Sequence, residues 1–144
     1  MKISNYYKYN KHISTSGLPK VDEFELIKKE GYDTVLSLSM PTDSITVENE
    51  DLILTNLGIV YLHIPVDFYE PKIKDFETFR LLLDAYDGKK LWIHCTKNYR
   101  VSAFMYLCDL IGNDNIDKEL LEKFWMPNET WQQFVDDVIE EFTQ

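Results

Sequence analysis

The chain has 144 residues, of which 44% are hydrophobic and 14% aromatic, with only five glycines and five prolines. This composition excludes a disordered chain and a collagen-like chain, and the length is typical of a single compact domain. Twenty-five acidic residues against fifteen basic ones give a formal net charge of −10, which argues against a general surface for nucleic acid or anionic lipid. We therefore expect neither a nucleic-acid nor a membrane partner, and any anionic ligand must enter a local site.

Cysteine usage and the N-terminal residues indicate a cytoplasmic protein. The two cysteines, Cys95 and Cys108, are too few for a disulfide scaffold and are typical of a reducing compartment. Residues 1–9 lack the apolar core of a signal peptide, and the chain has no run of eighteen apolar residues. No linker, repeat or low-complexity tract divides the sequence, so residues 1–144 are predicted to form one domain.

Short apolar segments alternate with amphipathic ones, which predicts an α/β domain with a central, mostly parallel sheet flanked by helices. In chain order the pattern predicts a helix at 21–30, a strand at 34–38, a helix at 47–57, a strand at 59–64, a helix at 72–86, a strand at 89–94, a helix at 100–112 and two further helices at roughly 117–125 and 129–142. Glycines follow the first three helices, and Asn128 is the predicted N-cap of the last one. The polar residues Ser14, Thr15 and Ser16, which precede Gly17, are expected to form a turn; a place beside an anion site is the alternative.

The junction from His94 to Ser102 carries the strongest chemical signal in the sequence. A predicted strand ends at Cys95 and a helix begins five residues later, so several backbone N–H groups and a helix N-terminus face one spot. Such groups bind oxyanions and favour the anionic form of a thiol. Arg100 is one of only two arginines in the chain and could clamp two oxygens of a phosphate. The alternative interpretation of Cys95 is a buried core cysteine.

The sequence from His94 to Arg100, followed by an apolar helix, resembles the phosphate-binding loop of cysteine-dependent protein tyrosine and dual-specificity phosphatases. It is still more similar to a bacterial group of phosphatase-like proteins of unknown substrate that is related to the dual-specificity fold. The resemblance covers most of the chain and rests on residues 13–19, 31–38, 57–67, 94–104 and 125–131. It implies a dual-specificity-phosphatase-like fold and a hydrolase that acts on a phosphorylated substrate or another small oxyanion, without a cofactor or metal.

The resemblance also implies a role for each residue of the loop. Cys95 would be the nucleophile, and Arg100 would hold the phosphoryl group together with the loop amides. The hydroxyl of Ser102 would help the thiolate to leave in the second step, and His94 would orient the loop, unless it is an ordinary core histidine. The phosphate-binding residues implied in this way are Thr96, Lys97, Asn98, Tyr99 and Arg100.

The loop departs from the phosphatase signature at two points. The signature has five residues between cysteine and arginine and usually glycine at the third position, whereas here four residues separate Cys95 from Arg100 and Asn98 takes the glycine position. Asparagine is the best substitute for glycine in a left-handed turn. Without a gap in the alignment, Ser102 falls on the hydroxyl position but Val101 falls on the arginine position. The shorter loop is therefore either a tighter cradle that still closes on phosphate or the mark of a non-catalytic anion-binding relative.

The loop length also permits a third interpretation. A span of six residues from cysteine to arginine, as from Cys95 to Arg100, is typical of rhodanese-like sulfurtransferases, whose cysteine carries a persulfide inside a similar cradle of amides. Loop length favours the sulfurtransferase, whereas the surrounding segments favour a phosphatase. We give the surrounding segments more weight because they span most of the domain.

Phosphoryl transfer also needs a proton donor for the leaving oxygen. Relatives of this fold keep an aspartate on the loop after the strand that here ends before Pro65, so Asp67 is the implied general acid and Glu70 is the reserve. The alternative role for Asp67 is that of a turn or capping residue before the helix at 72. His12 and His63 are isolated from other ligand types, so no metal is expected.

Three residues outside the loop receive structural predictions. Cys108 is expected in the core as part of an apolar helix, with a role as resolving thiol for Cys95 as the alternative. Trp125 and Trp131, which lie on either side of a Pro-Asn pair, are expected to anchor the C-terminal helices to the body of the domain.

Overall fold

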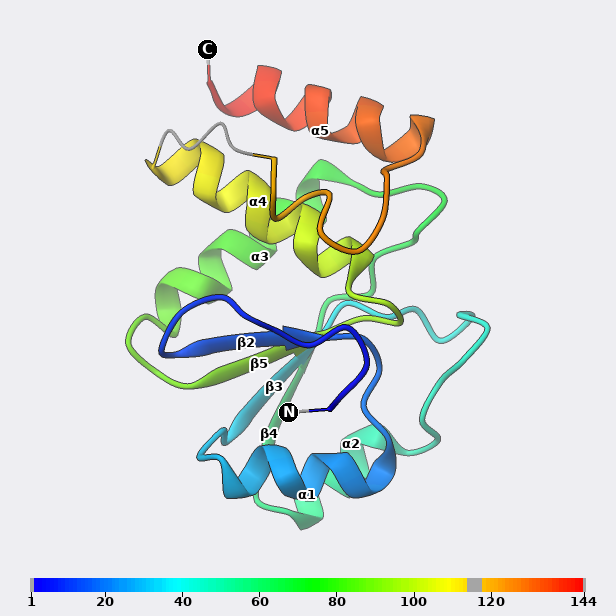
Figure 1. The fold of residues 1–144 in the computed structure, drawn as a ribbon, viewed down its shortest axis with the longest axis vertical. Coiled ribbons are helices and arrows are strands. Elements are labelled where there is room, and N and C mark those ends of the chain that lie inside the picture. Colours follow the sequence, from blue (N-terminus) through cyan, green and yellow to red (C-terminus); the bar gives the residue numbers. More distant parts are fainter. Residues whose placement is uncertain (1, 114–117, 144) are drawn as a thin grey trace.

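The computed structural model describes residues 2–113 and 118–143. A five-stranded sheet of order β1-β2-β5-β3-β4 forms its centre, and helices lie against both faces (Figure 1). The strands are β1 (Tyr7–Lys8), β2 (Ile13–Ser16), β3 (Thr34–Ser37), β4 (Val60–His63) and β5 (Leu91–His94). The helices are α1 (Val21–Lys29), α2 (Glu50–Asn56), α3 (Ile73–Ala85), α4 (Tyr99–Asn113) and α5 (Glu129–Phe142).

Strand β5 is the centre of the sheet and determines where the loops gather. It pairs in parallel with β2 on one side and with β3 on the other, and β4 continues the sheet in parallel beyond β3. Strand β1 adds an antiparallel edge. The α/β class and the mostly parallel sheet predicted from the sequence are therefore confirmed. Because parallel strands end at one edge of a sheet, the loops that follow β2, β3, β4 and β5 meet there.

Alternating side chains of the strands build one apolar core on each face of the sheet. Trp92 of β5 and Val35 of β3 pack with α1 and α2, whereas Leu36 and Ile93 on the same two strands pack with α3, α4 and α5. Figure 1 shows the two groups of helices on opposite sides of the sheet, with α5 outside α4. Within the described ranges, no helix is both long and apolar enough to cross a bilayer.

The polar turn predicted at 14–16 is wrong, because these residues form strand β2 and are buried. Ser14 Oγ lies 2.6 Å from the hydroxyl oxygen of Tyr32. Ser16 Oγ accepts a hydrogen bond from the indole of Trp92 at 2.9 Å. Because these buried hydroxyls have partners, the polar sequence does not prevent the segment from pairing with β5 inside the sheet.

The helix predicted at 117–125 is also wrong for the part that can be compared. Its first residue, Asp117, lies outside the described residues, and positions 119–124 form turns and bends instead of a helix. Trp125 then stacks on Tyr99 with ring centroids 4.5 Å apart. A helix of this length gains little stability by itself, so the tertiary contact of Trp125 decides the path of the segment.

The other predicted helices and strands are confirmed, with boundaries shifted by a few residues. The largest shift is in α2, which begins at Glu50 instead of 47. Asn128 caps α5 as predicted, since its side-chain oxygen accepts from the backbone N of Trp131 at 3.0 Å. Gly31 follows α1 with φ +94°, a conformation that favours glycine, and this explains the stop after that helix.

Phe104 on α4 joins the aromatic side chains of three helices. Its ring is buried against Phe76 and Phe79 of α3 and Phe134 of α5. Replacement by alanine leaves a cavity among rigid rings, so Phe104→Ala should lower the free energy of unfolding by about 3–5 kcal/mol. Urea unfolding followed by circular dichroism measures the loss. Leu81→Ala, at a side chain that is 70% exposed, is the control and should cost less than about 0.5 kcal/mol; equal losses in the two variants would contradict the prediction.

Candidate active site

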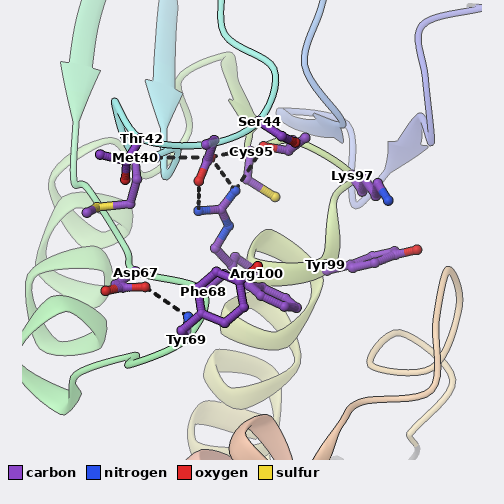
Figure 2. Close-up of a pocket in the computed structure, with 12 residues that line it drawn as sticks. Met40, Thr42, Ser44, Asp67, Phe68, Tyr69, Cys95, Lys97, Tyr99 and Arg100 are labelled. Atoms are coloured by element: carbon purple, nitrogen blue, oxygen red, sulfur yellow. Dashed lines mark hydrogen bonds and ion pairs between the residues drawn. The ribbon is translucent and has the colours of Figure 1, made fainter.

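The loop between β5 and α4 lines a cavity of about 380 Å³ at the carboxyl edge of the sheet. Cys95 is 1% exposed, and Figure 2 shows its sulfur beside the guanidinium of Arg100. The walls come from the loops that follow β3 and β4, so three loops converge on one space. The residues that line it are Met40, Thr42, Asp43, Ser44, Asp67, Phe68, Tyr69, Cys95, Thr96, Lys97, Tyr99 and Arg100.

Asn98 holds the loop in its shape. Its φ of +64° is left-handed, as predicted for the residue at the glycine position. Its side chain is buried and fully engaged: Nδ2 donates to Asn5 O at 2.8 Å and to Thr15 Oγ1 at 3.0 Å. Its Oδ1 accepts a hydrogen bond from Ser102 Oγ at 3.1 Å. The hydroxyl of Ser102, which was predicted to help the thiolate leave, is thus bonded to the side chain of Asn98 in this structure.

Asn5, which precedes β1, and the residues that follow β2 bond to the carbonyl groups of the same loop. Leu18 N donates to Thr96 O at 3.0 Å, and Asn5 Nδ2 donates to Lys97 O at 2.8 Å. Gly17 lies so close to the loop that a Cβ at this position would be 2.6 Å from Thr96 O. Only glycine fits such an approach without displacing backbone. The carbonyl groups of the loop are thus bonded on the side of the N-terminal segment.

The backbone N–H groups of residues 96–100 form the donor set of the cavity. In the described part of the chain they donate to no protein acceptor. They include the first turn of α4, where the helix dipole adds partial positive charge. An anion beside Cys95 can therefore use these groups directly. The side chain of Lys97 is exposed and points away from Arg100, so it contributes charge at the rim (Figure 2).

His94, directly before the cysteine, is fully buried and paired. Its Nε2 lies 2.6 Å from Glu50 Oε2 at the start of α2, and its Nδ1 lies 3.3 Å from Cys95 O. The ring therefore links α2 to the backbone of the loop. A buried ring with two polar partners fits both roles predicted for His94, the orienting residue of the loop and the core histidine.

Arg100 is paired with an acidic residue that the sequence analysis did not single out. Its Nη2 donates to Asp43 Oδ2 at 2.7 Å, and its Nη1 donates to Asp43 Oδ1 at 3.3 Å (Figure 2). Nη1 also donates to Val66 O at 2.8 Å, and Nη2 to Thr96 Oγ1 at 3.0 Å. Arg100 is only 3% exposed. Its guanidinium is fixed by bonds to residues of three loops, those that follow β3, β4 and β5.

Each member of the Asp43–Arg100 pair keeps the other one ionised. Burial opposes the charge of Asp43, but the hydrogen bonds and charge of Arg100 hold the pKa of that carboxyl below its ordinary value. Burial likewise opposes the charge of Arg100, but Asp43 and the neighbouring Cys95 raise the pKa of the guanidinium above its ordinary value. The carboxylate and guanidinium are thus both charged across the neutral pH range.

Asp67 and Glu70, the two candidate proton donors, lie in different environments. Asp67 lines the cavity, and its Oδ1 accepts a hydrogen bond from Tyr69 N at 2.9 Å (Figure 2). Glu70 is exposed and does not belong to the cavity lining. The turn contact expected as the alternative role of Asp67 is thus present, and the same residue also lines the cavity.

Comparison with known proteins identifies the family of the chain. No protein-family profile and no curated protein sequence matches the chain. Among solved structures, a candidate phosphatase of the DUF442 family from Shewanella putrefaciens CN-32 is 31% identical, with a TM-score of 0.90 over 98% of this chain and 95% of that one. The chain belongs to the DUF442 family.

More distant structures share the fold of this DUF442 protein. PTPMT1 in complex with PI(5)P is 13% identical with a TM-score of 0.77, and 96% of each chain is covered. The core catalytic domain of the PP-IP phosphatase SIW14 from S. cerevisiae, in complex with citrate, is 16% identical with a TM-score of 0.74, over 94% of this chain and 86% of that one. The dual-specificity-phosphatase-like architecture inferred from the sequence is therefore confirmed.

Sequence reasoning missed two charged residues of the DUF442 site, Asp43 and Glu50. Both lie in the segment after β3, and they bond to Arg100 and His94 respectively. The available signal was topological: a loop that follows a parallel strand next to β5 must reach the cysteine loop. Residue type gave no hint, because acidic residues in an acidic chain are mostly solvated.

The structure separates Cys108 from Cys95. Cys108 lies in α4, more than two turns beyond Tyr99, and packs against the margin of the core. Both cysteines are free, and burial raises the pKa of the Cys108 thiol to about 12. The predicted core placement is confirmed, and the alternative of a resolving thiol is wrong because the helix holds the two residues apart.

Trp125 and Trp131 anchor the C-terminal part of the chain, as predicted, and they do so on the site itself. The ring of Trp125 is stacked on Tyr99, with an interplanar angle of 1°. Trp131 is fully buried, and its indole N–H donates to Phe68 O at 2.7 Å. Two walls of the cavity are therefore supported from behind by the C-terminal segment.

The left-handed turn at Asn98 gives a prediction about loop stability. Asn98→Gly and Asn98→Ala both remove the side-chain hydrogen bonds, but only glycine adopts φ +64° without strain. Asn98→Ala should therefore be less stable than Asn98→Gly by about 1–2 kcal/mol, although glycine loses more chain entropy on folding. Urea unfolding midpoints of the two variants measure the difference. An alanine variant as stable as the glycine variant would show that the turn is not enforced.

Proposed function

We propose that this DUF442 protein is a cysteine-dependent phosphatase that hydrolyses a phosphate monoester through a phosphocysteine intermediate. The observation that carries the proposal is the convergence on one cavity of Cys95, Arg100, Asp67 and loop amides that have no acceptor in the described part of the chain. These are a nucleophile, a cationic clamp, an acid and a set of oxyanion donors. The candidate phosphatase of the same family supports the reaction class.

In the first step, the loop amides and Arg100 bind the nonbridging oxygens of the phosphoryl group. The thiolate of Cys95 attacks phosphorus, and a sulfur–phosphorus bond forms while the ester phosphorus–oxygen bond breaks. Asp67, in its acid form, donates its proton to the leaving oxygen, so the product leaves as a neutral alcohol or phenol. The fixed amides stabilise the charge that develops on the equatorial oxygens without reorganisation.

In the second step, a water molecule attacks the phosphorus of the intermediate. Asp67, now a carboxylate, takes a proton from this water, and the sulfur–phosphorus bond breaks with the electron pair returning to Cys95. Inorganic phosphate leaves, and the free enzyme is restored with Asp67 protonated. One carboxyl group therefore serves both steps, and Asp67 and Cys95 line the same cavity.

Two buried polar contacts position the nucleophile in this proposal. The pair of His94 and Glu50 fixes the backbone of Cys95 from the side of α2. The hydrogen bond from Ser102 to Asn98 fixes the turn of the loop from the side of α4. Ser102 thus acts through Asn98, by holding the amides aimed at the departing thiolate.

The shorter loop is compatible with this chemistry because of where Arg100 starts. It is the second residue of α4, and its side chain returns along the cavity to lie beside Cys95 (Figure 2). Contacts with Thr96 and Val66 hold the guanidinium there. A loop with four intervening residues therefore still brings thiol and guanidinium to one cavity.

Hydrolysis of p-nitrophenyl phosphate without added metal tests the proposal. Cys95→Ser should reduce turnover by at least about a thousandfold, because serine is a far weaker nucleophile at neutral pH. Cys108→Ser makes the same change at a cysteine outside the cavity and should keep the activity. Both variants are compared with wild type at matched concentration and mildly acidic pH.

The remaining outcomes favour the alternative functions. Folded wild type without turnover, or a Cys95→Ser variant that keeps it, would contradict a cysteine phosphatase. Release of cyanide-trappable sulfur from thiosulfate would instead indicate a rhodanese-like sulfurtransferase, as the length of the loop permits. Binding of an oxyanion without turnover would indicate a non-catalytic relative.

The different environments of Asp67 and Glu70 give a matched pair of variants. Asp67→Asn removes the carboxyl group on the cavity wall and should lower kcat by about a hundredfold or more. The loss should be greater with phenyl phosphate than with p-nitrophenyl phosphate, because the poorer leaving group needs protonation more. Glu70→Gln removes the exposed carboxyl and should stay within about twofold of wild type. The reverse order of losses would assign the acid to Glu70.

A further inference from the structure

Both terminal nitrogens of the Arg100 guanidinium are already bonded to protein acceptors in this structure. Its Nη1 and Nη2 both donate to the carboxylate of Asp43, at 3.3 and 2.7 Å. Their remaining hydrogens are used by Val66 O at 2.8 Å and Thr96 Oγ1 at 3.0 Å. This bidentate arrangement is the one that an arginine uses toward two oxygens of a phosphate. Asp43 therefore holds the edge of Arg100 that a substrate needs.

Asp43 is itself bonded by the groups expected around an anion. Thr96 Oγ1, in the cysteine loop, donates to Asp43 Oδ2 at 3.0 Å, and Met40 N donates to the same oxygen at 3.1 Å. Four donor groups in all converge on this carboxylate, two from Arg100 and one each from Thr96 and Met40. The side chain of Asp43 is 13% exposed, and it also lines the cavity that contains Cys95.

The segment that carries Asp43 is loosely packed on its other side. Two further cavities, of about 340 and 490 Å³, lie against it, and both are lined by Ile45, Thr46 and Val47. The side chain of Ile45 is 60% exposed. Val47 packs against the core on the side of α1 and α2, whereas residues 41–46 are exposed apart from half-buried Asp43. The bonds of Asp43 therefore tie this exposed stretch to the cysteine loop.

We propose that Asp43 is a resident carboxylate ligand of the oxyanion cradle, which an incoming phosphoryl group displaces from Arg100. The inference rests on the proposed phosphatase function, because it concerns the ligand exchange at the same cradle. In the free protein the carboxylate neutralises the guanidinium and keeps it over the cavity. When a phosphoryl group binds, Arg100 exchanges one anionic partner for another, and residues 40–48 lose their main attachment to the loop.

Charge favours the exchange once the substrate is seated. A phosphate monoester dianion carries twice the charge of a carboxylate and is bonded by the loop amides as well as by Arg100. The two anions cannot share the guanidinium edge without strong repulsion at short distance. Asp43 thus weakens anion binding to the cradle. The free energy of binding is reduced by the free energy needed to break the contacts between Asp43 and Arg100.

Isothermal titration calorimetry with sodium tungstate at neutral pH tests the exchange without requiring turnover. Asp43→Asn removes the competing charge and should bind tungstate at least about tenfold more tightly than wild type. Glu48→Gln removes the same charge from an exposed position on the same segment and is the matched control for long-range electrostatics. It should stay within about twofold of wild type.

Equal affinity in Asp43→Asn and wild type would overturn the proposal, because no competitor would have been removed. Weaker binding would also overturn it and would make Asp43 a positioning residue that Arg100 needs. If neither protein binds tungstate, the cradle is not an oxyanion site and the proposal fails. Turnover of the aryl phosphate is measured separately, so wild-type hydrolysis without tighter binding in the variant refutes the exchange alone, and tighter binding without hydrolysis refutes the phosphatase alone.

Hydrogen–deuterium exchange of the wild-type protein tests the same displacement even if Asp43→Asn does not fold. Saturating tungstate should slow exchange in residues 96–100, whose amides bind the anion. It should speed exchange in residues 40–48, beginning with the Met40 amide that now donates to Asp43. Slower or unchanged exchange in 40–48 would show that Asp43 stays on Arg100 and would overturn the proposal.

Discussion

Asn98 joins the cysteine loop and the start of α4 to two points near the N-terminal end of the described chain, Asn5 and Thr15. Its amide nitrogen bonds to Asn5 and to Thr15 in β2, and its oxygen accepts from Ser102 in α4. These bonds enforce a left-handed turn. The carbonyl groups of Thr96 and Lys97 are bonded to the N-terminal segment, whereas the backbone N–H groups of the loop stay available to the cavity. The donor set of the cavity depends on this separation, because five successive N–H groups at the start of a helix have no acceptor among the described residues.

The sheet order explains why the turn can be enforced so strongly. Strand β5 lies between β2 and β3, so the cysteine loop has a parallel neighbour on each side. The neighbour β2 and the residues around it supply Gly17 and Thr15, which approach the loop from behind. The neighbour β3 leads into the segment with Asp43 and Glu50, which bond to Arg100 and His94 respectively. The order of the strands therefore determines which polar groups reach the cysteine loop.

Much of this arrangement could be predicted from the sequence, and the reasons for the exceptions are physical. The apolar run of β5 followed by a cysteine, an arginine and an apolar helix identified the loop, and the proline after β4 pointed to Asp67. Strand β2 was not predicted because its sequence lacks the usual apolar pattern. Its serines are buried and form hydrogen bonds with Tyr32 and Trp92, which lie far away in the sequence. The failed helix at 119–124 has the same origin, since Trp125 finds its partner in α4.

The stacking of Trp125 on Tyr99 has a consequence for the order in which the site is completed during synthesis. The ribosome makes Cys95 and Arg100 before Trp125 and Trp131, the two residues that support the cavity walls. Until these indoles are present, the ring of Tyr99 lacks its stacking partner and the carbonyl of Phe68 lacks the hydrogen bond from Trp131. The aromatic walls of the pocket are therefore complete only when residues 125–131 have folded against Tyr99 and Phe68.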